Sequence, residues 1–243
     1  GYAIIRFLPA PQEEDLPFVR VFDHGFQGPG GWYIENSLTT IGQKDPLPEY
    51  NSTLWNSGIE ANKEIARKQK RRLTYFSNIY VVEDKANPQN EGKVFLFRYG
   101  KKIFDMVSSM ANPEFEDETQ VDVFNLWDGA NFKLKIRKVD GFSNYDKSEF
   151  MTSAPLSEDE SEMERVFGEQ HDLEEFIDQK SFKTYDELKT RLDTVLGNIQ
   201  TAAMTAPTSV ENDEAPFDGG TPIPESSTSE DENLDYFKKL AEA

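Results

Sequence analysis

The sequence predicts a mainly β fold, either a small barrel or a sandwich, with helices appended toward the C-terminal end. Three observations support this prediction: short segments of alternating polar and apolar residues, helical segments that open on capping sequences, and a last stretch poor in apolar residues. The 243 residues, 37% of them hydrophobic, suffice for one sizeable core. The longest apolar runs, such as Ile79–Val82, are far too short to cross a bilayer, so no membrane span and no membrane partner are expected.

Seven segments are predicted to be strands, because β-branched and aromatic residues alternate with polar ones along them. They are residues 2–8, 18–22, 32–35, 74–83, 93–99, 120–126 and 131–139. Residues 87–92, with the sequence NPQNEG, are expected to form the hairpin loop between the fourth and fifth strands, and residues 127–130 a tighter turn between the last two. Both pairs of strands should therefore be antiparallel neighbours.

Three helices are predicted from apolar residues at helical spacing. The first covers residues 101–110 and ends before Pro113, the second opens on a capping box at 157–160, and the third opens on a capping box at 184–187 and stops at Gly197. The later two are expected to pack on the barrel. Their predicted apolar faces are Met163, Val166, Phe167, Leu173, Phe176 and Ile177 in the second helix, and Leu188, Leu192, Val195 and Leu196 in the third.

Residues 201–243 are predicted to form a disordered acidic tail, because ten acids and two bases stand among Ala, Ser, Thr, Pro and Gly. Residues 234–240 regain apolar side chains, which fits a short docking motif for a partner protein and a frayed terminal turn equally well. The expected organisation is a core over residues 1–200, including a helical segment over 157–197, followed by the tail. The chain opens at Gly1 within an apolar segment, which suggests a truncated N-terminus.

The charge is unevenly distributed along the chain. Its net value is −19, yet residues 1–150 hold 22 acids and 19 bases whereas residues 151–243 hold 23 acids and 7 bases. Within the first part, residues 63–102 carry eleven bases against four acids. Such asymmetry predicts a nucleic-acid surface on one part of the chain and an acidic interaction tail on another.

The side chains needed for catalysis are scarce. There is no cysteine, so a disulfide framework, thiol catalysis and a thiolate metal site are excluded. His24 and His171 are the two histidines, so a zinc site made of protein ligands alone would need an unusual ligand set. Asp122 and Asp128 flank a predicted strand and could hold Mg²⁺ between them, but their spacing does not distinguish this from ordinary turn acids. No glycine pattern typical of a phosphate-binding loop follows a strand. The chain is therefore predicted not to be an enzyme.

Binding of single-stranded nucleic acid is better supported. Residues 70–76, with the sequence KRRLTYF, place three cations before two aromatic residues that strand alternation would point to opposite faces. Phe95, Phe97 and Tyr99 should share one face of the next strand, and residues 141–145 add Phe142 and Tyr145 in a glycine-led loop. Aromatic rings that stack on bases, beside cations that neutralise phosphates, are typical of single-strand binders. The alternative is that the strand aromatics form core and the cations only aid solubility; core is expected for Phe95 and function for Tyr145.

Seven short motifs occur together along the chain. They are residues 4–9 (IIRFLP), 24–26 (HGF), 31–35 (GWYIE), 91–95 (EGKVF), 100–103 (GKKI), 128–132 (DGANF) and 141–146 (GFSNYD). In this order, across about residues 2–197, the chain resembles the single-stranded-DNA-binding protein of T-even-type bacteriophages. The resemblance implies an OB-fold core with a helical flap and an acidic tail, acting in the cytoplasm of the infected host. It implies cooperative coating of single-stranded DNA in replication, recombination and repair, and replication and recombination proteins as partners of the tail.

The resemblance also implies roles for individual residues. Phosphate contacts are expected from Arg6, Lys70, Arg71, Arg72, Arg98, Lys101 and Lys102. Stacking on bases or lining of the cleft is expected from Tyr75, Phe97, Phe142 and Tyr145. Residues 70–74, with the sequence KRRLT, resemble a basic and hydroxyl-bearing motif to which the family's tails bind.

The sequence departs from the family pattern in three places. The family carries zinc on one histidine and three cysteines; here His24 matches the histidine, but Ser37, Leu47 and Tyr50 stand at the cysteine positions, so no cofactor is expected. Residues 36–57 must then be ordered by packing of Leu47, Tyr50, Leu54 and Trp55, or else be mobile. Two family tyrosines appear as Ile59 and Ala66, which weakens stacking there or moves it elsewhere. The basic N-terminal segment that gives the family its self-association is also absent.

Two other functions are alternatives to single-strand binding. The chain could be an acidic interaction scaffold of the replication machinery whose basic segment binds only its own tail. It could also be a carboxylate-dependent nuclease that requires Mg²⁺.

Overall fold

The computed structural model describes residues 1–197, which divide into two compact units. The first, called unit 1 below, combines Gly1–Val19 with Tyr75–Phe176, and unit 2 combines Arg20–Thr74 with residues 177–197. The predicted acidic tail and its terminal apolar segment lie outside the described residues. No helix within residues 1–197 has the length and hydrophobicity needed to cross a membrane.

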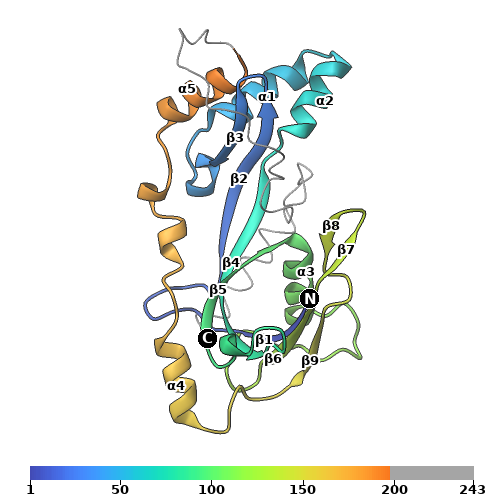
Figure 1. The fold of residues 1–243 in the computed structure, drawn as a ribbon, viewed down its shortest axis with the longest axis vertical. Coiled ribbons are helices and arrows are strands. Elements are labelled where there is room, and N and C mark those ends of the chain that lie inside the picture. The colour runs from blue at the N-terminus through green and yellow to red at the C-terminus, as the bar shows by residue number, and fades with distance from the viewer. Residues whose placement is uncertain (198–243) are drawn as a thin grey trace. The chain divides into compact units, whose positions relative to one another are not determined.

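The sheet of unit 1 is antiparallel and is built around the first strand (Figure 1). Strand β1 (Tyr2–Phe7) lies between β4 (Arg72–Glu83) and β6 (Ala130–Lys135), β9 (Glu149–Ser153) pairs with β6, and β5 (Val94–Gly100) pairs with β4. In this register Ile5 stands opposite both Val81 and Phe132. The predicted loop between the fourth and fifth strands is confirmed, and it contains the short 3₁₀ helix η2 (Pro88–Asn90).

Aromatic rings fill the core of unit 1. The Phe7 ring lies 5.6 Å from the Tyr99 ring, 5.7 Å from Phe124 and 5.9 Å from Phe132. A second group joins Phe18, Tyr75 and Phe104, in which the Tyr75 and Phe104 rings stack 4.0 Å apart. Aromatic side chains bury large areas in specific edge and stacked arrangements, so this packing stabilises the sheet that carries the site described below.

Two helices, a small hairpin and a 3₁₀ turn complete unit 1. Helix α3 (Lys101–Ala111) follows β5 directly and buries Ile103, Phe104 and Val107. The strands β7 (Arg137–Val139) and β8 (Phe142–Asn144) form the separate hairpin, which Figure 1 shows beside α3. Helix α4 (Glu160–Gly168) packs Val166 against Leu8 and Val94, and η3 (Glu174–Phe176) follows it.

Unit 2 is a long hairpin covered by helices. Strand β2 (Val19–Gly28) pairs with β3 (Gly31–Asn36), and the chain continues through η1 (Leu38–Ile41), α1 (Pro46–Asn56) and α2 (Glu60–Lys68) into the start of β4. After unit 1, the chain returns through η4 (Gln179–Ser181) and α5 (Tyr185–Val195). The core of the unit consists of Phe26, Tyr33, Leu38, Leu47, Phe182, Leu188, Leu192 and Val195.

The end of α5 is fixed against the turn between β2 and β3. The Gly30 amide donates a hydrogen bond to the Val195 carbonyl oxygen at 2.8 Å. A Cβ atom on Gly30 would overlap the Thr194 carbonyl oxygen, and one on Gly28 would overlap that of Val195. The missing side chains therefore allow the close approach that joins residues 28–30 to residues 194–195.

Several predicted elements are confirmed and others are wrong. Thr184 forms the predicted capping box with Glu187, and α5 ends before Gly197, whose φ is 76°. The predicted strand 120–126 is instead a series of turns, in which Asp122 Oδ1 accepts a hydrogen bond from the Phe124 amide at 3.0 Å. Val123 and Phe124 are consecutive and both buried, which a strand cannot achieve against one core face. Residues 127–130 therefore do not connect two strands, because the strand predicted before them is not formed.

Other differences concern boundaries and missed elements. Predicted strand 131–139 breaks at Ile136 into β6 and β7, whereas β8, β9, α1 and α2 were not predicted. The second predicted helix is capped by Asp159 rather than by Ser157, and α4 ends at Gly168, so that Leu173 and Phe176 lie beyond it. Helix α4 packs in unit 1 and α5 in unit 2. The predicted fold class holds in its coarser form, a mainly antiparallel sheet with several helices.

Candidate nucleic-acid interface

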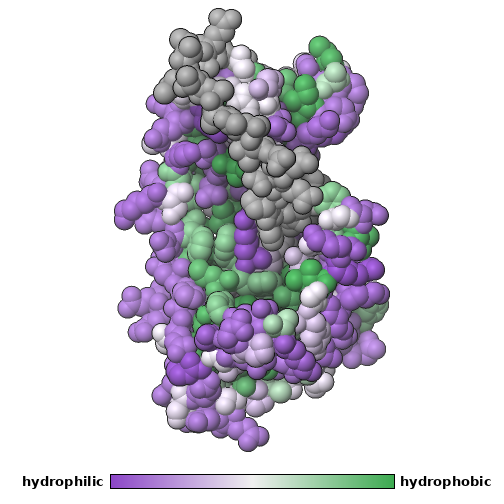
Figure 2. Space-filling model, viewed as in Figure 1, coloured by the Kyte–Doolittle hydropathy of each residue, from purple (hydrophilic) through white to green (hydrophobic). Residues whose placement is uncertain are grey.

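Exposed aromatic side chains and cations meet where β5 runs into α3. We call this the β5–α3 surface and define it by Phe95, Leu96, Phe97, Arg98, Lys101 and Lys102. Phe95 and Leu96 are 37% and 39% exposed, so the expectation that Phe95 is core is wrong. Figure 2 shows hydrophobic side chains gathered over β4 and β5 on the face in view, with hydrophilic ones around them. Phe97 is half-buried, and its ring stacks on Tyr99 at 5.4 Å.

Arg98 lies over a pair of stacked rings. Its guanidinium carbon is 5.9 Å from the centroid of Phe76, and the Phe76 ring stacks 4.4 Å from Phe176 at an interplanar angle of 16°. Tyr75 lies in the core and Phe76 on the half-buried opposite side, so the two rings point to opposite faces, as strand alternation predicts. The aromatic residue beside the cation is therefore Phe76, and Tyr75, at 0% exposure, is enclosed in the core.

The two lysines at the start of α3 have separate partners. A cation is unfavourable at a helix N-terminus because the helix dipole is positive there. An ion pair between the Lys101 ammonium group and Asp105, one turn later at 2.6 Å, offsets this unfavourable position. Lys102 donates a hydrogen bond to Asn144 Oδ1 on β8 at 3.1 Å. Gly100, the residue that caps α3, supplies no side-chain hydrogen bond. Lys102 thus joins the β5–α3 surface to the β7–β8 hairpin while keeping a neutral partner.

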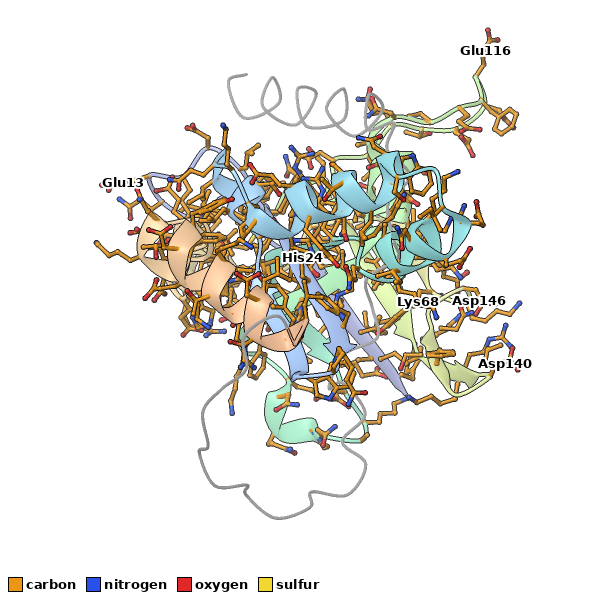
Figure 3. The ribbon with its side chains drawn as sticks, turned by 90° about the horizontal axis from the view of Figure 1, so that it is seen from above. Glu13, His24, Lys68, Glu116, Asp140 and Asp146 are labelled. Atoms are coloured by element: carbon orange, nitrogen blue, oxygen red, sulfur yellow. The ribbon has the colours of Figure 1, made fainter. Side chains whose placement is uncertain are left out.

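The β7–β8 hairpin adds an exposed ring to this surface. Its turn has positive φ at both central residues, 53° at Asp140 and 87° at Gly141, which is the backbone of a type I′ turn. Asp140 projects from the tip of the hairpin in Figure 3. Phe142 follows the turn and is 59% exposed. Tyr145 is half-buried, and burial raises the pKa of its hydroxyl group.

The run Lys70–Arg72 belongs to unit 2, and its two arginines have different partners. Arg72 forms an ion pair with Asp23 in which Nε donates to Oδ1 at 2.7 Å and a terminal nitrogen donates to the same oxygen. Arg71 lies 4.0 Å from the ring centroid of Phe22 and donates to Thr39 Oγ1 at 2.9 Å. Lys70 is half-buried. A carboxylate therefore offsets the charge of Arg72, whereas Arg71 is held by a ring and a hydroxyl group.

Arg6 is enclosed within unit 1. Its exposure is 0%, and one terminal nitrogen donates to the carbonyl oxygens of Leu126 and Ala154. Burial lowers its pKa to about 10. A phosphate group could reach this guanidinium group only if those carbonyl groups moved aside.

Two aromatic residues that lie near cations, Phe76 and Trp55, were not among the predicted site residues. Phe76 was considered with Tyr75, but the pattern could not decide which of the two stands beside a cation. Trp55, on α1, is 40% exposed, and its ring has Lys63 at 5.8 Å and Arg67 at 5.4 Å. The signal for Trp55 was a large aromatic residue in a polar segment directly before a basic one. Both cations near it are also paired with Glu60.

The described residues offer little for metal chemistry or catalysis. Within residues 1–197, no three His, Asp or Glu side chains come together as metal ligands. Burial raises the pKa of Asp122, whose carboxylate accepts from the Phe124 backbone. The geometry of the β5–α3 surface instead suits a single-stranded nucleic acid, because aromatic rings and cations follow one another along one continuous segment of chain.

Comparison with known proteins identifies related chains. A family model described as "gp32 DNA binding protein like" matches residues 1–196. The single-stranded DNA-binding proteins of Enterobacteria phages T2 and T4 are both 42% identical, over 84% and 81% of this chain and 68% and 66% of their own lengths. A third, from Enterobacteria phage RB70, is 48% identical over 31% of this chain and 65% of its own length. The matched part of the chain thus spans about two thirds of these relatives, whose names describe binding and no reaction.

Proposed function

The chain belongs to the family of gp32-like DNA-binding proteins, and from that premise we propose that it binds single-stranded DNA during phage DNA replication, without catalysing a reaction. Bases stack on exposed rings, and cations neutralise the phosphates beside them. The observation that carries this proposal is the β5–α3 surface, where Arg98 lies over Phe76 and Lys102 bonds to the hairpin that exposes Phe142.

The proposal assigns roles by exposure. Phe97, Phe142 and the newly found Phe76 would stack on bases or line the cleft, and Arg98, Lys101 and Lys102 would contact phosphates. Arg71 and Lys70, which belong to unit 2, would also contact phosphates, as the resemblance implies. Tyr145 would act at the edge of the surface, given its partial burial.

The finer parts of the proposal go beyond these residues. We propose an OB-fold type of barrel for unit 1, supported by antiparallel pairing of β1 with β4 and β6 around an aromatic core. Action in recombination and repair, and partner proteins bound through residues 201–243, belong to the same proposal. Self-association along DNA belongs to it only for a chain that carries the basic N-terminal segment of the family. The host cell is the compartment in which a phage replication protein would act.

A titration with oligo-dT tests the central claim. The protein is titrated at low salt and the quenching of its Trp and Tyr fluorescence is followed, first for the wild type and then for Arg98→Ala. Lys93→Ala is the matched control, because it removes the same charge at the opposite end of β5. Arg98→Ala should lower the magnitude of the slope of log K against log salt by about 0.7, the value for one phosphate contact on a single strand. Lys93→Ala should leave the slope unchanged.

The rival functions predict different results. An acidic scaffold would give no quenching at any salt concentration. A nuclease would shorten a labelled oligonucleotide in the presence of Mg²⁺, whereas a binding protein would leave its length unchanged.

A further inference from the structure

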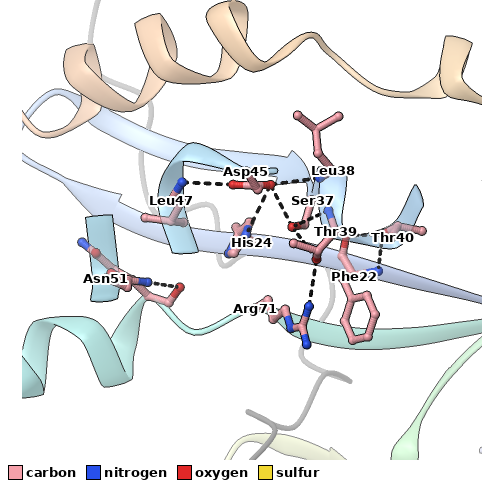
Figure 4. A network of polar contacts seen from close by, with 11 residues as sticks. Phe22, His24, Ser37, Leu38, Thr39, Thr40, Asp45, Leu47, Asn51 and Arg71 are labelled. Carbon is pink, nitrogen blue, oxygen red and sulfur yellow. Dashed lines mark hydrogen bonds and ion pairs between the residues drawn. The ribbon is translucent and has the colours of Figure 1, made fainter. Parts of the chain in front are cut away.

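A buried carboxylate organises the segment between β3 and β4 (Figure 4). Asp45 is 2% exposed and precedes α1. Its Oδ1 accepts a hydrogen bond from the Leu47 amide at 3.0 Å, which caps α1, and its Oδ2 accepts from the Leu38 amide at 2.9 Å and from Ser37 Oγ at 2.8 Å. One side chain therefore satisfies free backbone donors at the start of α1 and of η1 together.

The hydrogen bonds continue from Asp45 to the surface of unit 2. Ser37 Oγ lies 3.0 Å from Thr39 Oγ1, which accepts from Arg71 at 2.9 Å. A hydroxyl group has one proton to donate, and that of Ser37 goes to Asp45. Thr39 must therefore donate to Ser37. Every donor then points toward the carboxylate, and the chain begins at the Arg71 cation and ends at the Asp45 anion, an arrangement in which each bond polarises the next.

This network occupies the place where the family pattern puts zinc, and its donors do not fit that metal. Zinc in a structural site takes four Cys, His or carboxylate ligands. His24 and the nearby Asp45 carry groups of this kind, which makes two ligands of the four, and no third His, Asp or Glu joins them within residues 1–197. Leu47 has no donor atom and is fully buried in the apolar core, Ser37 donates its proton to Asp45, and Tyr50 is neither Cys, His nor a carboxylate. His24 Nε2 is 3.9 Å from Asp45 Oδ2.

We propose that the chain Asp45–Ser37–Thr39–Arg71 replaces the metal: together with the apolar packing of Leu38 and Leu47 it orders residues 37–47, and it holds Arg71 in a fixed orientation for a DNA phosphate. Asp45, Ser37 and Thr39 are thus positioning residues. The second half of the proposal rests on the proposed function, since it concerns the affinity for single strands. Holding a long side chain in advance removes part of the entropic cost of binding.

The metal-free half is tested by thermal unfolding of the whole protein. Melting curves of the wild type with excess EDTA and with added zinc chloride should superimpose. Asp45→Asn should lower the Tm by roughly 5–10 °C, because an amide nitrogen cannot accept the bonds that now reach Oδ2. A zinc-induced rise in Tm, or an Asp45→Asn protein that melts like the wild type, would overturn this half.

The positioning half is tested with Thr39→Val, which removes the hydroxyl group that accepts from Arg71 and leaves the bonds to Asp45 in place. Thr53→Val is the matched control, because within residues 1–197 the Thr53 hydroxyl bonds to carbonyl oxygens of its own helix α1. Thr39→Val should weaken oligo-dT binding roughly twofold to tenfold. Thr53→Val should bind like the wild type.

A double-mutant cycle separates positioning from a general effect on the fold. In an Arg71→Ala background, Thr39→Val should cause no further loss of binding, because the side chain that it positions is gone. Equal losses in both backgrounds, or wild-type affinity in Thr39→Val, would overturn the positioning half. If the wild type itself fails to bind oligo-dT, the proposed function fails, while the melting curves still decide the metal-free half.

Discussion

Two arginines, one in each unit, have different chemical settings. In unit 1, Arg98 lies over a ring and Lys102 bonds to a neutral amide, whereas in unit 2 Arg72 is bound to the carboxylate of Asp23. A cation paired with a partly buried carboxylate stabilises the fold, and its charge is already offset. An aromatic ring, in contrast, attracts a cation without neutralising its charge. The density of basic residues in the sequence therefore does not by itself locate the binding surface.

The largest effect should come from breaking the ion pair of unit 2. Asp23→Ala should lower the free energy of unfolding by about 3 kcal/mol, because it leaves the mostly buried Arg72 without its carboxylate. Oligo-dT affinity, measured well below the Tm, should not fall. Urea unfolding monitored by circular dichroism measures the first quantity, and Asp193→Ala, which breaks only an exposed pair with Lys189, is the control. A weakened affinity with unchanged stability would reverse the roles given to the two units.

The exposed ring of unit 1 should show the opposite pattern. Phe142→Ala should cost roughly 1–3 kcal/mol of oligo-dT binding, the usual contribution of one stacked base. The Tm should stay nearly unchanged, since most of the ring is exposed. Fluorescence titration and a melting curve on the same preparation decide this. Normal binding by Phe142→Ala would remove the β7–β8 hairpin from the interface.

A pair of single arginine changes then sharpens the comparison. Arg98→Ala should weaken binding by about 1 kcal/mol at low salt, as expected for one phosphate contact or one cation–π contact. Arg72→Ala should leave the salt dependence of binding as it is in the wild type and lower the Tm instead. Equal salt slopes for the two variants would show that the ion pair with Asp23 opens when DNA binds.

The smallest effect is expected at Trp55 in unit 2. Its two cations are also bound to Glu60, so by the same comparison they serve the α1–α2 pair rather than a ligand. Trp55→Leu should lower the free energy of unfolding by about 0.5–1 kcal/mol, the magnitude of an exposed cation–π contact, and leave the affinity unchanged. A tenfold loss of affinity would instead place Trp55 among the base-stacking residues.

The sequence predicted most reliably what depends on neighbouring residues. The capping box at Thr184 and the loop at 87–92 are local patterns, and both are confirmed. Helix α1 had an equally local signal, Asp45 followed by Pro46, which is a typical start of a helix. The predicted strand at 120–126 is wrong for a local reason. Val121 and Val123 alternate with polar residues as in a strand, but Asp122 accepts a hydrogen bond from a nearby backbone amide and bends the chain.

The chemical setting of each site residue could not be predicted in this way. Asp23 and Arg72 are 49 residues apart, so the pairing that removes Arg72 from the exposed cations exists only in the folded chain. Periodicity separated Tyr75 from Phe76 but could not tell which ring would face the core. The Asp45 network likewise joins residues whose individual patterns, a serine, a threonine and an arginine, carry no signal of their common role.

The contact between Gly30 and Val195 has a consequence for how the protein is made. Unit 2 is discontinuous: its first segment ends at Thr74, and the helix that completes its core begins at Tyr185. A ribosome adds about 5–20 residues per second, so the first segment waits roughly 5–20 s for its partner while unit 1 is being synthesised. During this interval, Tyr33, Leu38 and Leu47 lack the apolar face of α5 that covers them in the finished protein. We therefore expect the nascent hairpin β2–β3 to expose apolar side chains, and to be prone to aggregation, until α5 has been made.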